Sequence, residues 1–78
     1  MEMQDVKSSN VAQIGHEGSK MRVKFRNGSV YEYDGVDRDS YRAVRDGESV
    51  GRAYNKTIRG GGFESRKVEF DEDGNEKS

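Results

Sequence analysis

Residues 20–34 alternate between apolar and charged side chains, and this alternation constrains the fold more than any other feature of the chain. A period of two places successive side chains on opposite faces of a β-strand. Asn27-Gly28 interrupts the alternation and is typical of a hairpin turn. The segment therefore predicts two antiparallel strands that share one apolar face. The residues of that face are Met21, Val23, Phe25, Tyr31 and Tyr33.

The length of the turn decides the register of this hairpin. A two-residue loop leaves both tyrosines beside basic residues of the preceding strand. A three-residue loop over residues 26–28, with Gly28 in the left-handed conformation, pairs Val23 with Tyr31 and Met21 with Tyr33. We predict the three-residue loop, because it collects the large apolar side chains on one face.

Two further segments have strand-like patterns. Residues 8–18 predict a first strand with Ala12 and Ile14 on its inner face and Val11 displaced by a bulge. A weaker alternation over residues 66–70 is compatible with one more strand at the sheet edge. We therefore predict an α+β fold, in which a small antiparallel three-stranded meander, extended by this fourth edge strand, is packed by two short helices.

The two helices are predicted from their caps. Asp37 is a typical N-cap, and the helix that follows it is expected to continue to about residue 46. Ser49 is the corresponding N-cap of a second helix, which the glycine run at 60–62 ends, with Gly60 left-handed. The apolar residues of both helices are expected to face the core. They are Tyr41, Val44, Val50, Tyr54 and Ile58.

The charge distribution is uneven along the 78 residues. The net charge of −1 combines −2 over residues 1–19, +4 over residues 20–59 and −3 over residues 60–78. We interpret residues 71–78 as a disordered acidic tail. The chain has no cysteine, no apolar run as long as a membrane span of about 18 residues, and no signal-peptide pattern at its start. We therefore expect a cytoplasmic protein without membrane contact.

The chain also carries a set of aromatic, glycine and polar residues that is specific enough to indicate a family. The set comprises Ser8, Ser9, Ile14, Gly15, Phe25, Asn27, Gly28, Tyr31, Glu32, Tyr33, Val36, Tyr41, Ser49, Gly51, Asn55, Ile58 and Arg59. With these residues the chain resembles the KTSC domain, a short module found at the C-terminal end of some lysyl-tRNA synthetases and as free-standing bacterial and phage proteins. It departs from the usual pattern at His16, Asp37 and Tyr54, where Tyr, Pro and Phe are common. The resemblance implies a small α+β domain, which we place at residues 6–60, and an RNA-binding role. The alternation described above predicts an edge extension over residues 61–70.

Basic residues are the candidates for this role. One set, Arg22, Lys24 and Arg26, follows the hairpin, and a second, Arg52, Lys56 and Arg59, is expected on one side of the second helix. Lysine and arginine contacts to phosphates bind nucleic acid without reading its sequence. The predicted nucleic-acid-binding residues are Arg22, Lys24, Arg26, Arg45, Arg52, Asn55, Lys56 and Arg59.

Structural roles for the same residues stay open. The basic strips also fit a solvated surface, or ion pairs with Asp46, Glu48 and the acidic tail. Arg59 either contacts a ligand or holds Ser9 and the first strand in place, and Asn55 either caps a buried backbone group or contacts a ligand. The tyrosines fit a core as well as a surface on which bases stack.

Catalysis, metal binding and a cofactor are not expected. His16 is the only histidine, and no cysteine is present to complete a transition-metal site. We therefore predict a non-catalytic module that binds RNA or another nucleic acid through a basic face. One alternative is a small protein-binding inhibitor or adaptor, of a kind that a phage could encode. Another is a protein that captures a small nucleotide between Asn55, Arg59 and a tyrosine.

Overall fold

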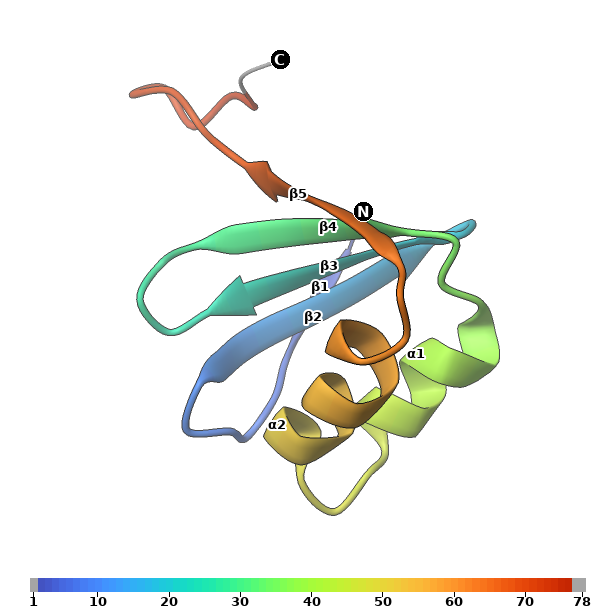
Figure 1. Ribbon diagram of the computed structural model, residues 1–78. Coiled ribbons are helices and arrows are strands. Elements are labelled where there is room, and N and C mark those ends of the chain that lie inside the picture. Colours follow the sequence, from blue (N-terminus) through green and yellow to red (C-terminus); the bar gives the residue numbers. More distant parts are fainter. Residues whose placement is uncertain (1, 77–78) are drawn as a thin grey trace.

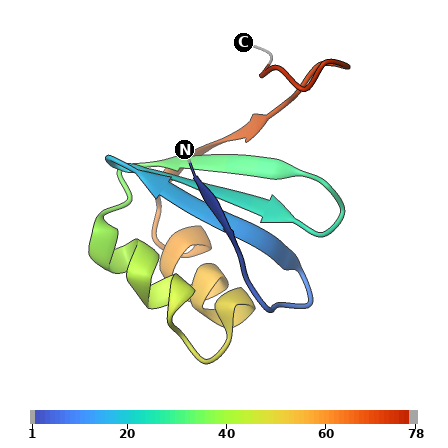
Figure 2. The ribbon, with the colours of Figure 1, turned by 180° about the vertical axis from the view of Figure 1, so that it is seen from behind.

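The computed structural model describes residues 2–76 and contains a five-stranded antiparallel sheet with helices packed against one face (Figure 1). The strands are β1 (Met3–Asp5), β2 (Val11–Glu17), β3 (Lys20–Phe25), β4 (Val30–Asp34) and β5 (Glu64–Val68), and they lie side by side in chain order. Between β4 and β5 the chain forms α1 (Arg38–Arg45), α2 (Val50–Ala53) and the π-helical turn η1 (Tyr54–Arg59). Figure 2 shows from behind that these helical segments stay on one side of the sheet. The face that they cover is termed the inner face, and the opposite one the outer face.

The hairpin of β3 and β4 has the predicted register. Both expected pairs are present, Val23 opposite Tyr31 and Met21 opposite Tyr33. Gly28 has a φ of 94°, a region that residues with a side chain rarely adopt. The three-residue loop is therefore confirmed, together with the shared apolar face that it produces.

The α+β class and the two helices are confirmed, but the prediction of three strands with an optional fourth undercounts the sheet. β1 pairs with β2, with Met3 opposite Gly15, and it was missed because three residues are too few to show an alternation. β5 is the predicted edge strand, and it pairs with β4 through Glu32 opposite Arg66. It starts before residue 66 and ends before Phe70.

The predicted bulge is present in β2, between Val11 and Gln13. Ala12 is the extra residue, so the alternation shifts and Val11 shares the inner face with Ile14. Val11 is 1% exposed and Ile14 is 0% exposed, whereas Ala12 is only half-buried. The assignment of Ala12, in place of Val11, to the inner face was therefore wrong.

Both helical segments begin at their predicted caps. The Asp37 carboxylate accepts a hydrogen bond from the Ser40 N–H over 3.0 Å. The Ser49 hydroxyl accepts one from the Arg52 N–H over 3.3 Å. These bonds satisfy N–H groups that have no partner within the helix, which explains why each helix starts where it does.

The second helical segment ends differently from the prediction. α2 runs directly into η1, where the Gly60 N–H donates to the Asn55 carbonyl over 3.0 Å, five residues back. Gly60 has a φ of −85°, and the left-handed residue is Gly62, with a φ of 74°. The prediction of a left-handed Gly60 was wrong, because the wide final turn keeps Gly60 within the helical hydrogen bonding.

The core lies between the helical segments and the inner face. All five helical residues that were expected to point inward are buried, with Val44 0% and Ile58 1% exposed. The His16 ring packs at the edge of this core, where it stacks on Tyr41 at 5.1 Å and bonds the Val36 carbonyl over 2.7 Å. These contacts attach α1 to the sheet. The cleft described below lies instead beside α2 and η1.

Residues 71–76 form a turn after β5. The Asp71 carboxylate accepts hydrogen bonds from the N–H groups of Asp73, over 3.0 Å, and Asn75, over 2.8 Å. Phe70 and Glu76 form an isolated β-bridge, which turns the chain back toward the sheet. The predicted disorder of this segment stays a prediction, and residues 77–78 of the expected tail lie outside the described part of the chain.

Candidate functional site

A cleft of about 790 Å³ opens between the second helical segment and the inner face of the sheet. Its volume is within the range of about 300–1,000 Å³ that is usual for small-molecule sites. One wall comes from α2 and η1, and the other comes from β3, β4 and the loop before β2. The cleft is lined by Ser9, Asn10, Val11, Phe25, Arg26, Asn27, Tyr31, Tyr33, Gly51, Tyr54, Asn55, Ile58, Arg59, Phe63 and Ser65.

Arg26 fixes the loop that closes one end of the cleft. Its side-chain Nε donates to the Ser8 carbonyl over 2.5 Å, and its backbone N–H donates to the Asn10 carbonyl over 2.9 Å. The loop also approaches α2 closely, since a Cβ at Gly51 would lie 3.3 Å from the Ser8 hydroxyl. Arg26 thus has the anchoring role that was considered for Arg59.

Asn55 and Arg59 reach the cleft from the π-helical turn η1. Hydrogen bonds from each residue to the fifth residue before it widen the helix, and such turns are frequent at functional sites. Asn55 and Arg59 line the cleft, whereas Arg52 and Lys56 do not. The structure thus separates Arg59 from the two residues with which α-helical spacing had grouped it. Within residues 2–76, no hydrogen bond or ion pair involves the side chain of Asn55 or Arg59, so both are accessible to a ligand.

Five aromatic side chains line the cleft, and their exposure divides them into two groups. Tyr33 and Tyr54 are 7% and 6% exposed, and their hydroxyl groups bond each other. Burial raises the pKa of Tyr54, and the bond to Tyr33 raises it further. Phe25, Tyr31 and Phe63 are only half-buried, and Phe25 contacts Tyr31 edge to face with 5.8 Å between ring centres. The buried pair is therefore structural, and the half-buried rings offer a surface for stacking.

The cleft is cationic. Arg26 and Arg59 are its charged lining residues, and none of the described residues in the lining is acidic. Its neutral polar groups are asparagine amides and serine hydroxyls, which both donate and accept hydrogen bonds. Guanidinium groups bind carboxylates and phosphates well, and partial enclosure by protein strengthens their electrostatic interactions relative to water. The combination suits a ligand that carries both an anionic group and a planar ring.

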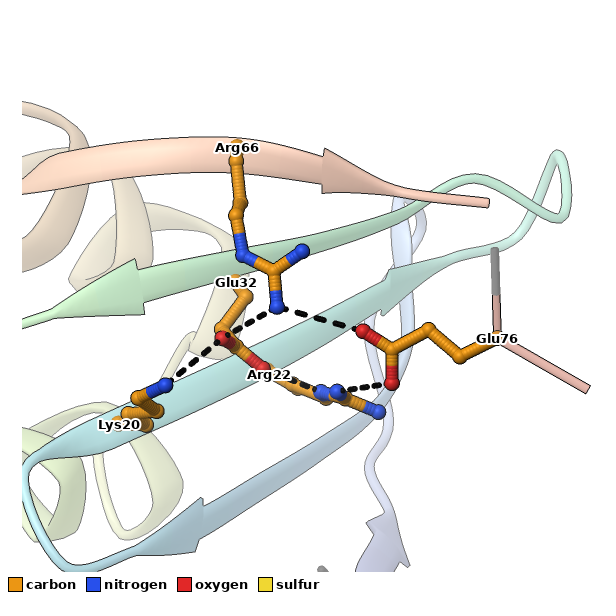
Figure 3. Close-up of polar contacts among 5 residues, drawn as sticks. All are labelled: Lys20, Arg22, Glu32, Arg66 and Glu76. Carbon is orange, nitrogen blue, oxygen red and sulfur yellow. Dashed lines mark hydrogen bonds and ion pairs between the residues drawn. The ribbon is translucent and has the colours of Figure 1, made fainter. Parts of the chain in front are cut away.

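Arg22 and Lys24 of the hairpin strip lie on the outer face, where Arg22 is paired with two carboxylates (Figure 3). Glu32 is 3% exposed there, and its carboxylate accepts bonds from Arg22 Nε over 2.6 Å and from Arg66 over 2.9 Å. Lys20 lies 3.7 Å from the same carboxylate. Burial alone would raise the pKa of Glu32, but the bonds from both arginines outweigh it and lower this pKa. Lys24 is exposed on the same face, apart from this network.

Glu76 completes the network from the turn after β5. One of its oxygens accepts a bond from Arg22 over 2.8 Å, and the other accepts one from Arg66 over 3.3 Å. These bonds lower the pKa of the Glu76 carboxyl, with Arg22 making the largest contribution. Arg22 therefore pairs with two carboxylates, those of Glu32 and Glu76. It does not line the cleft that contains Arg26 and Arg59.

The remaining predicted residues lie on the helices. The Arg45 guanidinium pairs with Asp46 over 2.9 Å and lies above the Tyr41 ring, 5.7 Å from its centre. Arg52 and Lys56 are exposed and have no ion pair within residues 2–76. Of the eight predicted residues, the structure therefore brings Arg26, Asn55 and Arg59 into one site.

Neither a metal site nor a membrane span is found in the described chain. Across residues 2–76, no three His, Cys, Asp or Glu side chains are placed to hold a metal ion together. The helices in this part of the chain are also too short or too polar to cross a membrane.

Comparison with known proteins identifies the family. The family model of the KTSC domain matches residues 7–63. The chain belongs to the KTSC domain family. The crystal structure of a KTSC domain protein from Yersinia pestis is similar to this fold, with a TM-score of 0.81 and 28% sequence identity over 87% of this chain and 97% of that chain. A comparison with curated proteins finds no match.

The KTSC segment contains nearly the whole cleft, whereas the outer network extends beyond it. Ser65 is the one cleft residue outside residues 7–63, whereas Arg66 and Glu76 both lie outside them. Phe63, Arg66 and Glu76 were missed as functional candidates. The only signal for Phe63 was its position as an isolated aromatic residue after three glycines. Arg66 and Glu76 had no local sequence signal, because their contacts depend on the order of the strands in the sheet.

Proposed function

We propose that this KTSC domain is a non-catalytic module that binds single-stranded RNA, with one nucleotide seated in the cleft. The observation that carries the proposal is the convergence of half-buried aromatic rings with Arg59, Asn55 and Arg26 in a cleft without acidic lining. Single-strand binders combine stacking rings with basic groups that follow the backbone. A cytoplasmic location, which suits a chain without cysteine, completes the proposal.

Each group has a distinct part in this proposal. A base stacks on Tyr31 or Phe63, which is worth about 1–3 kcal/mol per base in known single-strand binders. The Arg59 guanidinium contacts the phosphate, and the Asn55 amide pairs with the edge of the base. Arg26 holds the loop and adds positive potential at the mouth of the cleft.

Single-stranded RNA fits better than a duplex for two reasons. A concave cleft admits an unstacked base, and the bases of a duplex are not available for such contact. A duplex would need an extended basic surface along its phosphates, and on the outer face Arg22 and Arg66 are confined to one cluster around Glu32.

Chemical-shift mapping tests the proposal. A single-stranded RNA octamer is titrated into the ¹⁵N-labelled protein, and the amide and side-chain signals are followed. We expect the largest shifts at the side-chain amide of Asn55 and in η1, with smaller shifts at α1. Shifts confined to the outer face, or no shifts at all, would refute the seating of RNA in the cleft.

A second candidate function is the capture of a free nucleotide, which the limited volume of the cleft favours. Arg52 and Lys56 separate the two functions, because they lie on the helix outside the cleft and can contact only the flanking phosphates of a longer chain. For RNA binding, the Arg52→Gln, Lys56→Gln variant should lose affinity for the octamer and keep its affinity for a mononucleotide. Equal affinity of the wild type for octamer and mononucleotide would favour nucleotide capture. If neither binds, a protein partner becomes the better hypothesis.

A further inference from the structure

The outer face of the sheet carries two guanidinium groups that together hold one carboxylate (Figure 3). Arg22 comes from β3, Arg66 comes from β5, and the carboxylate is that of Glu76. Each oxygen of Glu76 bonds a different arginine, over 2.8 Å and 3.3 Å. A phosphate group presents its oxygens to paired arginines in a similar way. The Glu76 carboxylate therefore occupies a position that suits a phosphate.

The two carboxylates of the network have different roles. Glu32 is 3% exposed, lies between both arginines and bonds each of them, so it fixes their positions. The Glu76 side chain is 36% exposed and comes from a turn at the edge of the sheet, where solvent weakens ion pairs. Glu32 is thus part of the site, whereas Glu76 is an occupant that another anion can replace.

The surroundings also favour an anion. With Glu76 displaced, Lys20, Arg22 and Arg66 surround the single charge of Glu32. A hollow of about 270 Å³ adjoins Arg22, lined also by Lys24 and by Phe70, which is 44% exposed. A phosphate held by the arginines therefore has space beside it for the rest of its molecule.

We propose that Arg22 and Arg66 form a phosphate-binding site on the outer face of the sheet, and that Glu76 is its built-in competitor. The site lies on the face opposite the cleft and does not depend on the function proposed for the cleft. Arg66 and Glu76 follow the segment that matches the KTSC domain, so the site extends beyond that segment.

Glu76→Gln tests the proposal, with inorganic triphosphate as the probe. Binding is read from the Nε–Hε signals of Arg22 and Arg66 in ¹⁵N-labelled protein at low salt. We expect the Kd of Glu76→Gln to be about fivefold lower than that of the wild type, because the substitution weakens the intramolecular competitor. Glu72→Gln is the matched control, because it makes the same charge change in the same turn without a contact to either arginine, and it should leave the Kd within about twofold of the wild type.

Arg66→Gln in the Glu76→Gln background should remove the gain in affinity for triphosphate. The buried Glu32 carboxylate still has Arg22 and Lys20 as partners in this variant, so we expect the fold to be preserved. A second arm replaces triphosphate by single-stranded RNA and reads the same two signals. A gain with triphosphate alone identifies free polyphosphate as the source of the phosphate, and a gain with RNA identifies the nucleic-acid backbone. If Glu76→Gln gains no more than Glu72→Gln with either probe, or if Arg66→Gln leaves the gain intact, the proposal is wrong.

Discussion

Replacement of Glu32 by glutamine tests how far the outer network stabilises the sheet. Arg22 Nε bonds Glu32 over 2.6 Å, and their side chains are 21% and 3% exposed. A hydrogen bond between charged groups contributes about 1.5–3 kcal/mol when it is partly buried. Glutamine retains one neutral acceptor, and Arg66 is half exposed, so we expect a loss of about 1–2 kcal/mol, mostly from the Arg22 contact. For a domain of this size the melting temperature should fall by about 5–15 °C.

The effect should depend on pH in a defined direction. The pKa of Glu32 is lowered in the folded protein, so its contribution is present above its ordinary pKa of 4.5 and is lost as the pH falls through the folded-state value. Thermal unfolding of both proteins, followed by circular dichroism, should therefore show a difference in melting temperature at pH 7 that shrinks as the pH falls below 4.5. Glu64→Gln, an exposed change on β5, is the matched control and should alter the melting temperature little. An unchanged melting temperature for Glu32→Gln at pH 7, or a difference that persists at low pH, would refute this reasoning.

Three further predictions concern the hairpin, the tyrosine pair and the tail. Gly28→Val should destabilise the domain by about 1–2 kcal/mol in urea unfolding, because φ is 94° although no atom lies within 4 Å of the added Cβ. Tyr54→Phe should lower the free energy of unfolding by about 1–2 kcal/mol, since it leaves the buried Tyr33 hydroxyl unpaired. The double variant Tyr33→Phe, Tyr54→Phe should lose less than the sum of the two single variants. Residues 71–76 should show lower heteronuclear NOE values than β5, and removal of residues 71–78 should hardly change the melting temperature; a large decrease would show that the turn is part of the fold.

The elements whose local pattern is complete could be predicted from the sequence. Gly28 and the spacing of the apolar residues determine the register of β3 and β4. Asp37 and Ser49 determine the helix starts, because each cap acts within three residues. β1 was not predictable, because three residues are too few to show an alternation. The place of Val11 depends on which residue of the bulge is the extra one.

The candidate site was predictable only in part. Asn55 and Arg59 were identified as a pair, but their separation from Lys56 arises from the π-helical turn, which no residue type specifies. The role of Arg26 depends on a contact with a loop 18 residues away in the chain. The outer network joins Arg22 to Glu76 across 54 residues, and only the strand order brings them together. Topology thus creates contacts that local spacing cannot encode.

The most direct test of RNA binding in the cleft is a titration of the single-stranded RNA octamer against the wild type and Arg59→Gln at two salt concentrations. Arg38→Gln is the matched control, since it makes the same charge change at an exposed arginine that does not line the cleft. We predict that the wild type binds more weakly at the higher salt, and that Arg59→Gln raises the Kd at least fivefold and lowers the salt slope by about one. Arg38→Gln should change the Kd by less than about twofold. Absence of binding by the wild type, or equal effects of Arg59→Gln and Arg38→Gln, would contradict RNA binding in the cleft.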